Sequence, residues 1–99
     1  MVRQGILGSR ELNTRRDGQM VRVAGQNVMH QAPPTAKGFY FTTLEDENGF
    51  INVIVRPSVY AHYRRTIRHL PLLMIEGKVQ RESAVTNVLC HRAMPVPHQ

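Results

Sequence analysis

The sequence predicts an all-β fold: a five-stranded OB-fold barrel with one helix between its third and fourth strands. Two observations carry this prediction. Five segments have the alternation or the β-branched composition of strands, and one amphipathic segment with helical spacing separates the third from the fourth. The OB-fold is a partly open barrel of five strands that binds oligomers across its second and third strands. An SH3-like barrel is the structural alternative, but it would not account for a helix at that position.

A hairpin between residues 35 and 55 is the clearest local signal in the chain. Residues 39–44 and 51–55 are rich in aromatic and β-branched side chains, which fit a pleated sheet surface. The acidic segment 46–49 between them ends in Asn-Gly, which can supply the positive φ angles of a hairpin turn. These are the expected second and third strands.

Closing the hairpin over this turn fixes which side chains share a face, because side chains alternate along each strand. The more uniformly apolar face is assigned to the core, and it carries Tyr40, Thr42, Leu44, Ile51, Val53 and Val55. The opposite face is then expected to look outward, and it carries Phe39, Phe41, Thr43, Asn52, Ile54 and Arg56. A register slip of one residue would exchange the two faces.

The remaining strands are expected at residues 20–29, 72–81 and 85–94. The first of them alternates apolar and polar residues, and Gly25 within it indicates a bulge or a sharp bend. Gly77 indicates another bend in the fourth strand. A first strand that bends sharply can serve both halves of a barrel, as the OB-fold requires.

Two helices are expected. Residues 59–68 have one apolar face, with Ser58 as N-cap and Leu70-Pro71 as the end of the helix. A short helix begins near Ser9, which is expected as its N-cap, and ends by Asp17-Gly18. The face of the longer helix that points to the core is formed by Val59, Tyr60, Tyr63 and Ile67.

We therefore expect three parts: a lead-in at residues 1–19 with residues 1–8 loose, an OB-fold domain at 20–94, and a flexible tail at 95–99. No apolar run is long enough to cross a bilayer, and the first residues lack the apolar core of an export signal, so we expect no membrane contact and no export. Cys90 is the single cysteine, which excludes an internal disulfide and favours a reduced, cytoplasmic setting.

The charge of the chain favours a polyanionic partner. The formal net charge is +6, with 13 Lys and Arg residues against 7 Asp and Glu. All but two of the basic residues are arginines, which bind phosphate through two parallel hydrogen bonds and stack on bases. A basic surface of this kind is the electrostatic footprint of nucleic-acid binding, although it also occurs as a merely solvated face.

Catalysis has little support in the sequence. The acidic run Glu45-Asp46-Glu47 could bind Mg²⁺, but such runs usually close a turn and stay solvated. Cys90 is expected as a small buried hydrophobic residue. No ligand spacing connects the histidines, which are His30, His62, His69, His91 and His98, so we expect no metal. We also expect no cofactor and no catalytic residue.

Binding has more support. An exposed aromatic beside an amide and arginines is the surface on which single-stranded nucleic acid stacks its bases. The helix arginines Arg64, Arg65 and Arg68 are expected mainly as a solvated face, with a binding role as the less favoured alternative. The candidate nucleic-acid-binding residues are Arg22 and Gln26 on the first strand, Lys37 and Arg81 on the rim, and Phe39, Phe41, Thr43, Asn52, Ile54 and Arg56 on the hairpin.

Several motifs spread over about residues 17–93 occur together, namely VRVAG at 21–25, TAKG at 35–38, FTTLEDENG at 41–49, NVIV at 52–55, Pro57 and VQRE at 79–82. Together they resemble the C-terminal OB domain of error-prone bacterial C-family DNA polymerases, which are DNA polymerase III alpha subunits used in damage-induced mutagenesis. The departures from the family pattern are His30, Asn48 and Arg56.

The resemblance implies a domain that binds single-stranded template DNA in translesion synthesis and repair, and that contacts the rest of a polymerase or other lesion-bypass proteins. It also implies that this chain alone is not an enzyme, because the catalytic aspartates of such polymerases lie in a separate palm domain. We expect a monomer. Two alternatives stay open: an RNA-binding OB domain of the anticodon-recognition type, and a protein-interaction module.

Overall fold

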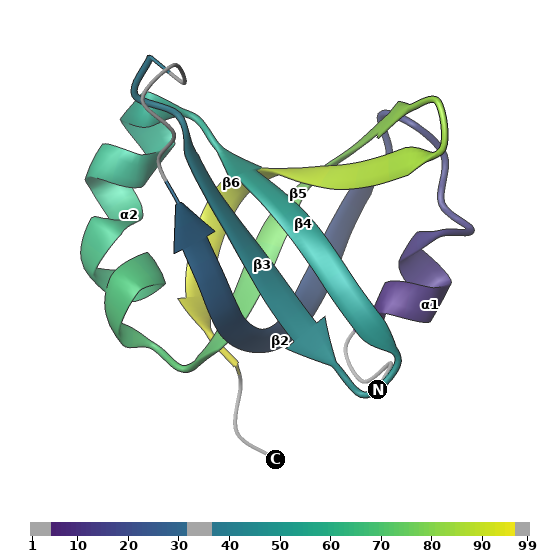
Figure 1. The fold of residues 1–99 in the computed structure, drawn as a ribbon, viewed down its shortest axis with the longest axis horizontal. Helices are drawn as coiled ribbons and strands as arrows, with labels where there is room; N and C mark the ends of the chain where they lie inside the picture. Colours follow the sequence, from purple (N-terminus) through teal and green to yellow (C-terminus); the bar gives the residue numbers. More distant parts are fainter. Residues whose placement is uncertain (1–4, 32–36, 97–99) are drawn as a thin grey trace.

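The structure is a computed structural model that describes residues 5–31 and 37–96. Figure 1 shows strands coiled into a barrel, with one long helix at its side and a short helix near the N-terminus. The elements in chain order are β1 (Ile6–Leu7), α1 (Ser9–Leu12), β2 (Met20–Gln31), β3 (Tyr40–Asp46), β4 (Gly49–Val55), α2 (Pro57–His69), β5 (Leu72–Glu82) and β6 (Val85–Pro95).

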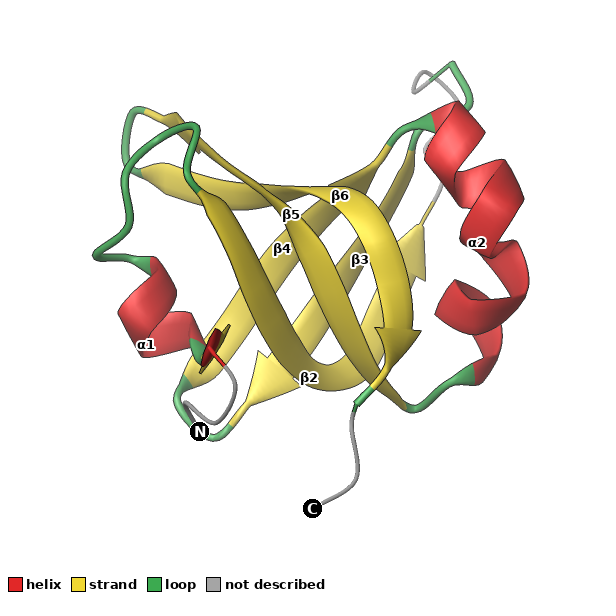
Figure 2. Ribbon diagram, turned by 180° about the vertical axis from the view of Figure 1, so that it is seen from behind, coloured by secondary structure: helices red, strands yellow, loops and turns green. Residues whose placement is uncertain are grey.

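The strands close into a ring. Their order in the sheet is β1-β2-β3-β4-β6-β5, and β2 also pairs with β5, so β2 to β6 form the ring and β1 is attached to it at β2. Every pairing in the ring is antiparallel except that of β4 with β6, which is parallel over three residue pairs. Seen from behind in Figure 2, β5 and β6 form the opposite wall, and α2 lies between β4 and β5 in the chain. The predicted barrel with one helix at this position is confirmed.

Strand β2 belongs to both walls of the barrel, and Gly25 lies where it passes from one to the other. Residues 20–26 pair with β5 and residues 26–31 pair with β3. A Cβ on Gly25 would lie 2.8 Å from the carbonyl oxygen of Glu45, so only glycine lets the two backbones approach this closely. The expected bend is therefore present, while the irregularity in register lies two to four residues further on, between Asn27 and Met29.

The core fills the ring, and the predicted strand parity is correct. All six hairpin residues that were assigned to the core are buried. They meet apolar side chains from the other strands and from α2, of which Val23, Ile67 and Ile75 are fully buried. Burial of each such aliphatic side chain contributes about 1.5–3 kcal/mol to stability. The hydroxyl of Thr42, buried among them, donates a hydrogen bond to the side-chain oxygen of Asn27.

Helix α2 is fixed to the barrel at two points. The ring of Tyr60 stacks on that of Tyr40 in β3, with centroids 4.2 Å apart and planes 19° from parallel. Near the C-terminus of the helix, the side-chain amide of Asn27 donates a 2.7 Å hydrogen bond to the carbonyl oxygen of Ile67. The predicted apolar face of the helix packs on the core as expected.

The helix starts differ from prediction. Helix α2 has Arg56 as N-cap and Pro57 in its first turn, not Ser58 as N-cap, because proline lacks the N–H that a first-turn residue leaves unpaired. Helix α1 ends at Leu12, well before Asp17-Gly18. Its N-cap is Gly8, whose N–H donates a 2.9 Å hydrogen bond to the carboxylate of Glu11. Ser9 is the first helical residue, not the N-cap.

The prediction that residues 1–8 form a loose lead-in is wrong for Ile6 and Leu7. Ile6 and Leu7 form β1, which pairs in parallel with Arg22 and Val23 of β2 and is buried. Of the expected tail, Pro95 belongs to β6, and residues 97–99 lie outside the described part of the chain, as do residues 1–4 and 32–36. None of the described helices is long and apolar enough to cross a membrane.

The close approach of β5 to β6 at Gly77 provides a test of the fold. A Cβ at Gly77 would lie 2.2 Å from the carbonyl oxygen of Leu89, a backbone atom that cannot move aside. Gly77→Ala should therefore lower the free energy of unfolding by more than about 2 kcal/mol in urea denaturation. Gly5→Ala is the comparison: no atom lies within 4 Å of its added methyl, so it should lose stability only through the backbone strain of its positive φ, about 1 kcal/mol. Equal losses in the two variants would contradict the steric account.

Candidate nucleic-acid interface

The outer face of β3 and β4 brings four of the predicted binding residues together. In the ladder, Phe41 pairs with Ile54 and Thr43 with Asn52, as the sequence predicted. The four side chains alternate with buried neighbours and are partly or fully exposed. In Figure 1, these two strands form the front wall of the barrel. The result is a mixed surface in which an aromatic ring, a hydroxyl and an amide are adjacent.

Phe50 is an exposed aromatic residue on this face that the prediction left out. It pairs with Glu45 at the start of β4 and has the same orientation as Asn52, two residues along the strand. Its side chain is 63% exposed, which is more than that of any other large apolar residue in the described part of the chain. The sequence could have indicated this exposed position, because the register that places Asn52 on the outer face also places Phe50 there.

Strand β6 extends the same face beyond β4. Asn87 pairs with Asn52 and Leu89 with Ile54, and both are partly exposed, while Val88 between them is buried. No local pattern in the sequence indicates this pairing, because the two strands are parallel and more than 30 residues apart. A second amide therefore lies beside the first on the outer face.

Three predicted residues lie at the end of this face where β3 begins and β4 ends. Phe39 directly precedes β3 and is partly exposed, Lys37 precedes it with a positive φ of 53° and an exposed side chain, and Arg56 follows β4 and is exposed. These positions place two positive charges and an aromatic ring at one end of the face. The acidic turn lies at its other end.

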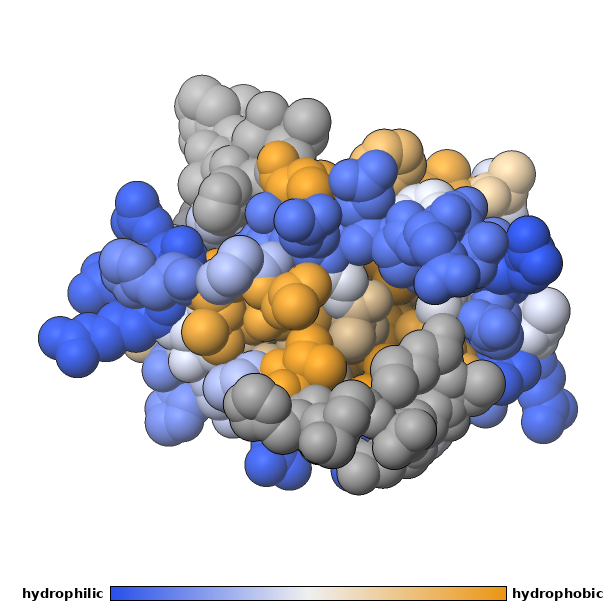
Figure 3. All heavy atoms as spheres, turned by 90° about the horizontal axis from the view of Figure 1, so that it is seen from below, coloured by the Kyte–Doolittle hydropathy of each residue, from blue (hydrophilic) through white to orange (hydrophobic). Residues whose placement is uncertain are grey.

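Gln26 lies beside the acidic turn, over the underside of the barrel. It pairs with Glu45 of β3 and with Leu72 of β5, and it is exposed. It borders an apolar groove of about 560 Å³ lined mainly by Ile6, Leu7, Gly8, Ala24, Gly25, Leu72, Val96 and residues 45–47. Figure 3 shows apolar side chains gathered on this underside between hydrophilic margins. Gln26 thus belongs to the lower border of the outer face.

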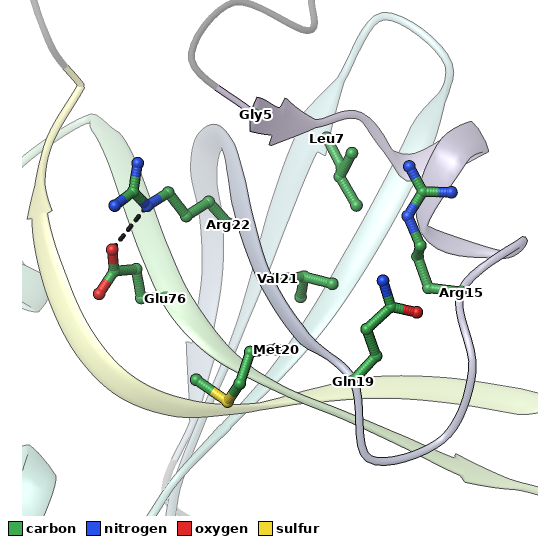
Figure 4. Close-up of a pocket in the computed structure, with 8 residues that line it drawn as sticks. All are labelled: Gly5, Leu7, Arg15, Gln19, Met20, Val21, Arg22 and Glu76. Atoms are coloured by element: carbon green, nitrogen blue, oxygen red, sulfur yellow. Dashed lines mark hydrogen bonds and ion pairs between the residues drawn. The ribbon is translucent and has the colours of Figure 1, made fainter.

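Arg22 does not join the face. It lines a hollow of about 550 Å³ where β2 runs beside β1 and β5. Figure 4 shows it there together with Arg15 and Gln19. Its Nε donates to the carboxylate of Glu76 at 2.6 Å, and Arg92 approaches the other oxygen of the same carboxylate at 3.4 Å. The bend in β2 separates Arg22 from the part of the strand that pairs with β3, which is why its alternation with Gln26 misled the prediction.

Arg81 does not reach the face as a free rim residue either. Its guanidinium donates to the carbonyl oxygens of Asn13 and Arg15, and its backbone N–H donates to the carboxylate of Asp17 at 2.7 Å. These bonds tie β5 to the segment between α1 and β2. The sequence could not show this, because the partners are more than 60 residues away in the chain.

The acidic turn is a structural junction. The Asp46 carboxylate accepts hydrogen bonds from the N–H groups of Asn48 and Gly49, each at 2.9 Å, and from the N–H and hydroxyl of Ser9. Burial raises the pKa of Asp46, but these four donors outweigh it and hold the pKa below its ordinary value. Only Gly49 in this turn has positive φ, so Asn48 does not adopt the expected conformation.

The described residues show neither a cluster of metal ligands nor an activated thiol. Within residues 5–31 and 37–96, no three His, Cys, Asp or Glu side chains are grouped as metal ligands. Cys90 is fully buried, as predicted, and burial raises the pKa of its thiol to about 12, with Arg56 lowering it slightly. A thiol with this pKa is almost wholly protonated at neutral pH and is a poor nucleophile.

Comparisons with known proteins identify relatives of the chain. Error-prone DNA polymerase from Bdellovibrio bacteriovorus is 43% identical over 88 residues, which are 89% of this chain and 8% of that protein. The protein of the same name from Anaeromyxobacter dehalogenans is 39% identical over 97% of this chain and 9% of that protein. The one from Xanthomonas campestris is 44% identical over 90% of this chain and 8% of that protein. The chain is homologous to a segment of error-prone DNA polymerases. It spans less than a tenth of the length of these relatives.

Solved structures confirm the fold. Part of asparaginyl-tRNA synthetase from Pyrococcus horikoshii superposes with a TM-score of 0.74 at 17% identity, covering 91% of this chain and 22% of that one. The E. coli protein ygiW superposes with a TM-score of 0.69 at 16% identity, covering 92% and 89%. At these identities the likeness concerns the fold alone, which is an OB-fold. None of the known protein-family models matches the chain.

The Asp46 junction predicts a specific sensitivity to acid. Because its pKa is lower when the chain is folded, the ionised carboxylate stabilises the fold above the unfolded value of 3.8, and this stabilisation is lost as the pH falls through the folded value. Asp46→Asn should lower the free energy of unfolding at pH 7 by about 1–3 kcal/mol.

The measurement is urea denaturation from pH 7 down to pH 2. The difference between wild type and Asp46→Asn should shrink below pH 4. Glu47→Gln is the matched control, since Glu47 is exposed at the same turn, and it should change stability little. A difference for Asp46→Asn that stays constant at low pH would contradict a role for the ionised form.

Proposed function

We propose that this domain is a non-catalytic module that binds single-stranded DNA, and that it serves an error-prone DNA polymerase in translesion synthesis and repair in the cytoplasm. The observation that carries the proposal is the outer face of β3 and β4, where the exposed ring of Phe50 lies beside the exposed amide of Asn52. The homology to polymerases supports DNA as the partner.

The chemistry of the face suits unpaired bases. A base can stack on an exposed aromatic ring, which contributes about 1–3 kcal/mol per base with little sequence preference. Phe50 and Phe41 are two such rings on neighbouring strands. The amides of Asn52 and Asn87, which pair across β4 and β6, can both donate and accept hydrogen bonds at base edges. Stacking then supplies affinity, and the amides supply orientation.

The charge of the domain suits a phosphate backbone. Arg56 and Lys37 lie at the end of the face opposite the acidic turn, and both are exposed. The net charge of +6 adds a long-range attraction to any polyanion. Binding should therefore depend on salt, because each neutralised phosphate releases condensed counterions.

The proposal leaves nucleotide transfer to other parts of the polymerase. The carboxylate of Asp46, which the acidic run offered as a metal ligand, is occupied by four hydrogen-bond donors of the protein. The domain would contribute by holding template, and its contacts with other lesion-bypass proteins are part of the same proposal. RNA is the competing ligand, and a protein-interaction module is the competing function.

Substitution of the exposed ring tests the proposal. Phe50→Ala should weaken binding of oligo-dT by about 1–3 kcal/mol, measured by fluorescence anisotropy at low salt, because a stacking platform is lost. Its thermal unfolding should change little, since the side chain is mostly exposed. Met20→Ala is the matched control: Met20 is 54% exposed on another wall of the barrel, and its substitution should leave affinity unchanged.

Phe41→Ala should weaken binding in the same way. Failure of the wild-type domain to bind oligo-dT at low salt would refute the proposal. Equal loss in Phe50→Ala and Met20→Ala would refute the placement of the interface. Tighter binding of oligo-U than of oligo-dU would instead favour RNA, because the 2′-hydroxyl is the difference between these two oligonucleotides.

A further inference from the structure

Helix α2 carries a cluster of positive side chains that the proposed interface does not use. Arg64, Arg65, Arg68 and His69 line a hollow of about 440 Å³ on the second half of the helix. Helix α2 itself, from Pro57 to His69, contains no acidic residue. In Figure 3, hydrophilic side chains project from the edge of the molecule on the side where Figure 1 shows this helix.

These arginines have no carboxylate partner in the described part of the chain. The ion pairs there join Arg22 and Arg92 to Glu76 of β5. Arg64 and Arg68 are four residues apart, and like charges at this spacing destabilise a helix by a few tenths of a kcal/mol. The negative end of the helix dipole offsets this cost only in the last turn, so it accounts for Arg68 and His69 but not for Arg64 or Arg65.

The cluster is held in a fixed position beside the barrel. The Tyr40–Tyr60 stack and the hydrogen bond from Asn27 to Ile67 fix both halves of α2 to β2 and β3. The helix also begins at the end of the proposed interface, because its N-cap is Arg56, the residue that follows β4. A chain of phosphates that leaves the outer face near Arg56 and follows α2 would meet its next arginine at Arg64, eight residues further along the chain.

We propose that the Arg64, Arg65 and Arg68 face of α2 is a second phosphate-binding surface, which takes the backbone of the same single strand beyond the nucleotides that stack on β3 and β4. This inference rests on the proposed function and extends it. The sheet binds bases, whereas these three arginines offer guanidinium groups that contact phosphate without reading sequence. The site covered on DNA is then longer than the sheet alone would cover.

The test compares short and long oligonucleotides with two charge-matched variants. The double variant Arg64→Gln with Arg68→Gln removes charge from α2. The control, Arg15→Gln with Arg16→Gln, removes the same charge from the segment between α1 and β2, which Figure 1 shows on the opposite side of the barrel from α2. OB-folds cover roughly 4–16 nucleotides, so oligo-dT of about 5 and about 16 nucleotides should probe the sheet alone and the sheet with the helix.

We expect the helix variant to bind the short oligonucleotide like the control, and to bind the long one roughly tenfold more weakly at low salt. Its slope of log K against log salt should also fall by about 1.4, which corresponds to two lost phosphate contacts on single-stranded DNA. Arg64→Lys with Arg68→Lys should restore most of the affinity. Thermal unfolding of each variant establishes that the fold is intact.

The outcomes separate this inference from the proposed function. If the wild-type domain binds neither oligonucleotide, the proposed function fails. If it binds both, and the helix variant matches the control on the long one, the proposed function stands and the helix surface is refuted. A loss on the short oligonucleotide equal to that on the long one would also refute it, because the arginines would then contact the nucleotides that occupy the sheet.

Discussion

The structure depends on one close approach of backbones, at the point where β2 leaves β5 and joins β3. A strand can serve two walls of a barrel only if it bends where it changes partners, and Gly25 allows this because a Cβ there would collide with the carbonyl of Glu45. Gly77 permits a second close approach, between the paired strands β5 and β6 at the point where their register shifts. Both contacts lie within the ladders of the ring, and the ring sets the orientation of β3 and β4, and with it the face that we propose as the interface.

The hairpin was predictable because its information is local. Strict alternation and a two-residue connection determine the register, and the observed pairs Phe41–Ile54 and Thr43–Asn52 follow from them directly. Strand β1 was not predictable, because two residues carry no periodicity and their pairing depends on β2. The contributions of β6 were missed for a related reason, since a parallel pairing across more than 30 residues leaves no local trace.

The arginines were the least predictable part of the candidate site. A guanidinium reaches far from its backbone, so its partner is decided by the three-dimensional fold and not by its neighbours in sequence. Arg22 and Arg81 were both expected at the interface, yet one pairs with Glu76 and the other binds the backbone beside α1. The helix arginines, expected mainly as a solvated face, are the ones without a carboxylate partner among the described residues.

The distribution of charge along the outer face gives it a direction. Glu45 lies on that face, paired with Phe50, and Glu47 is exposed in the adjoining turn, so this end repels phosphate. Lys37 and Arg56 lie at the other end, from which α2 and its arginines continue. A single strand on this face would therefore keep its bases over Phe50 while its phosphates shift toward Arg56. On this view the acidic turn, besides being the junction that Asp46 holds together, sets the end at which the bound strand stops.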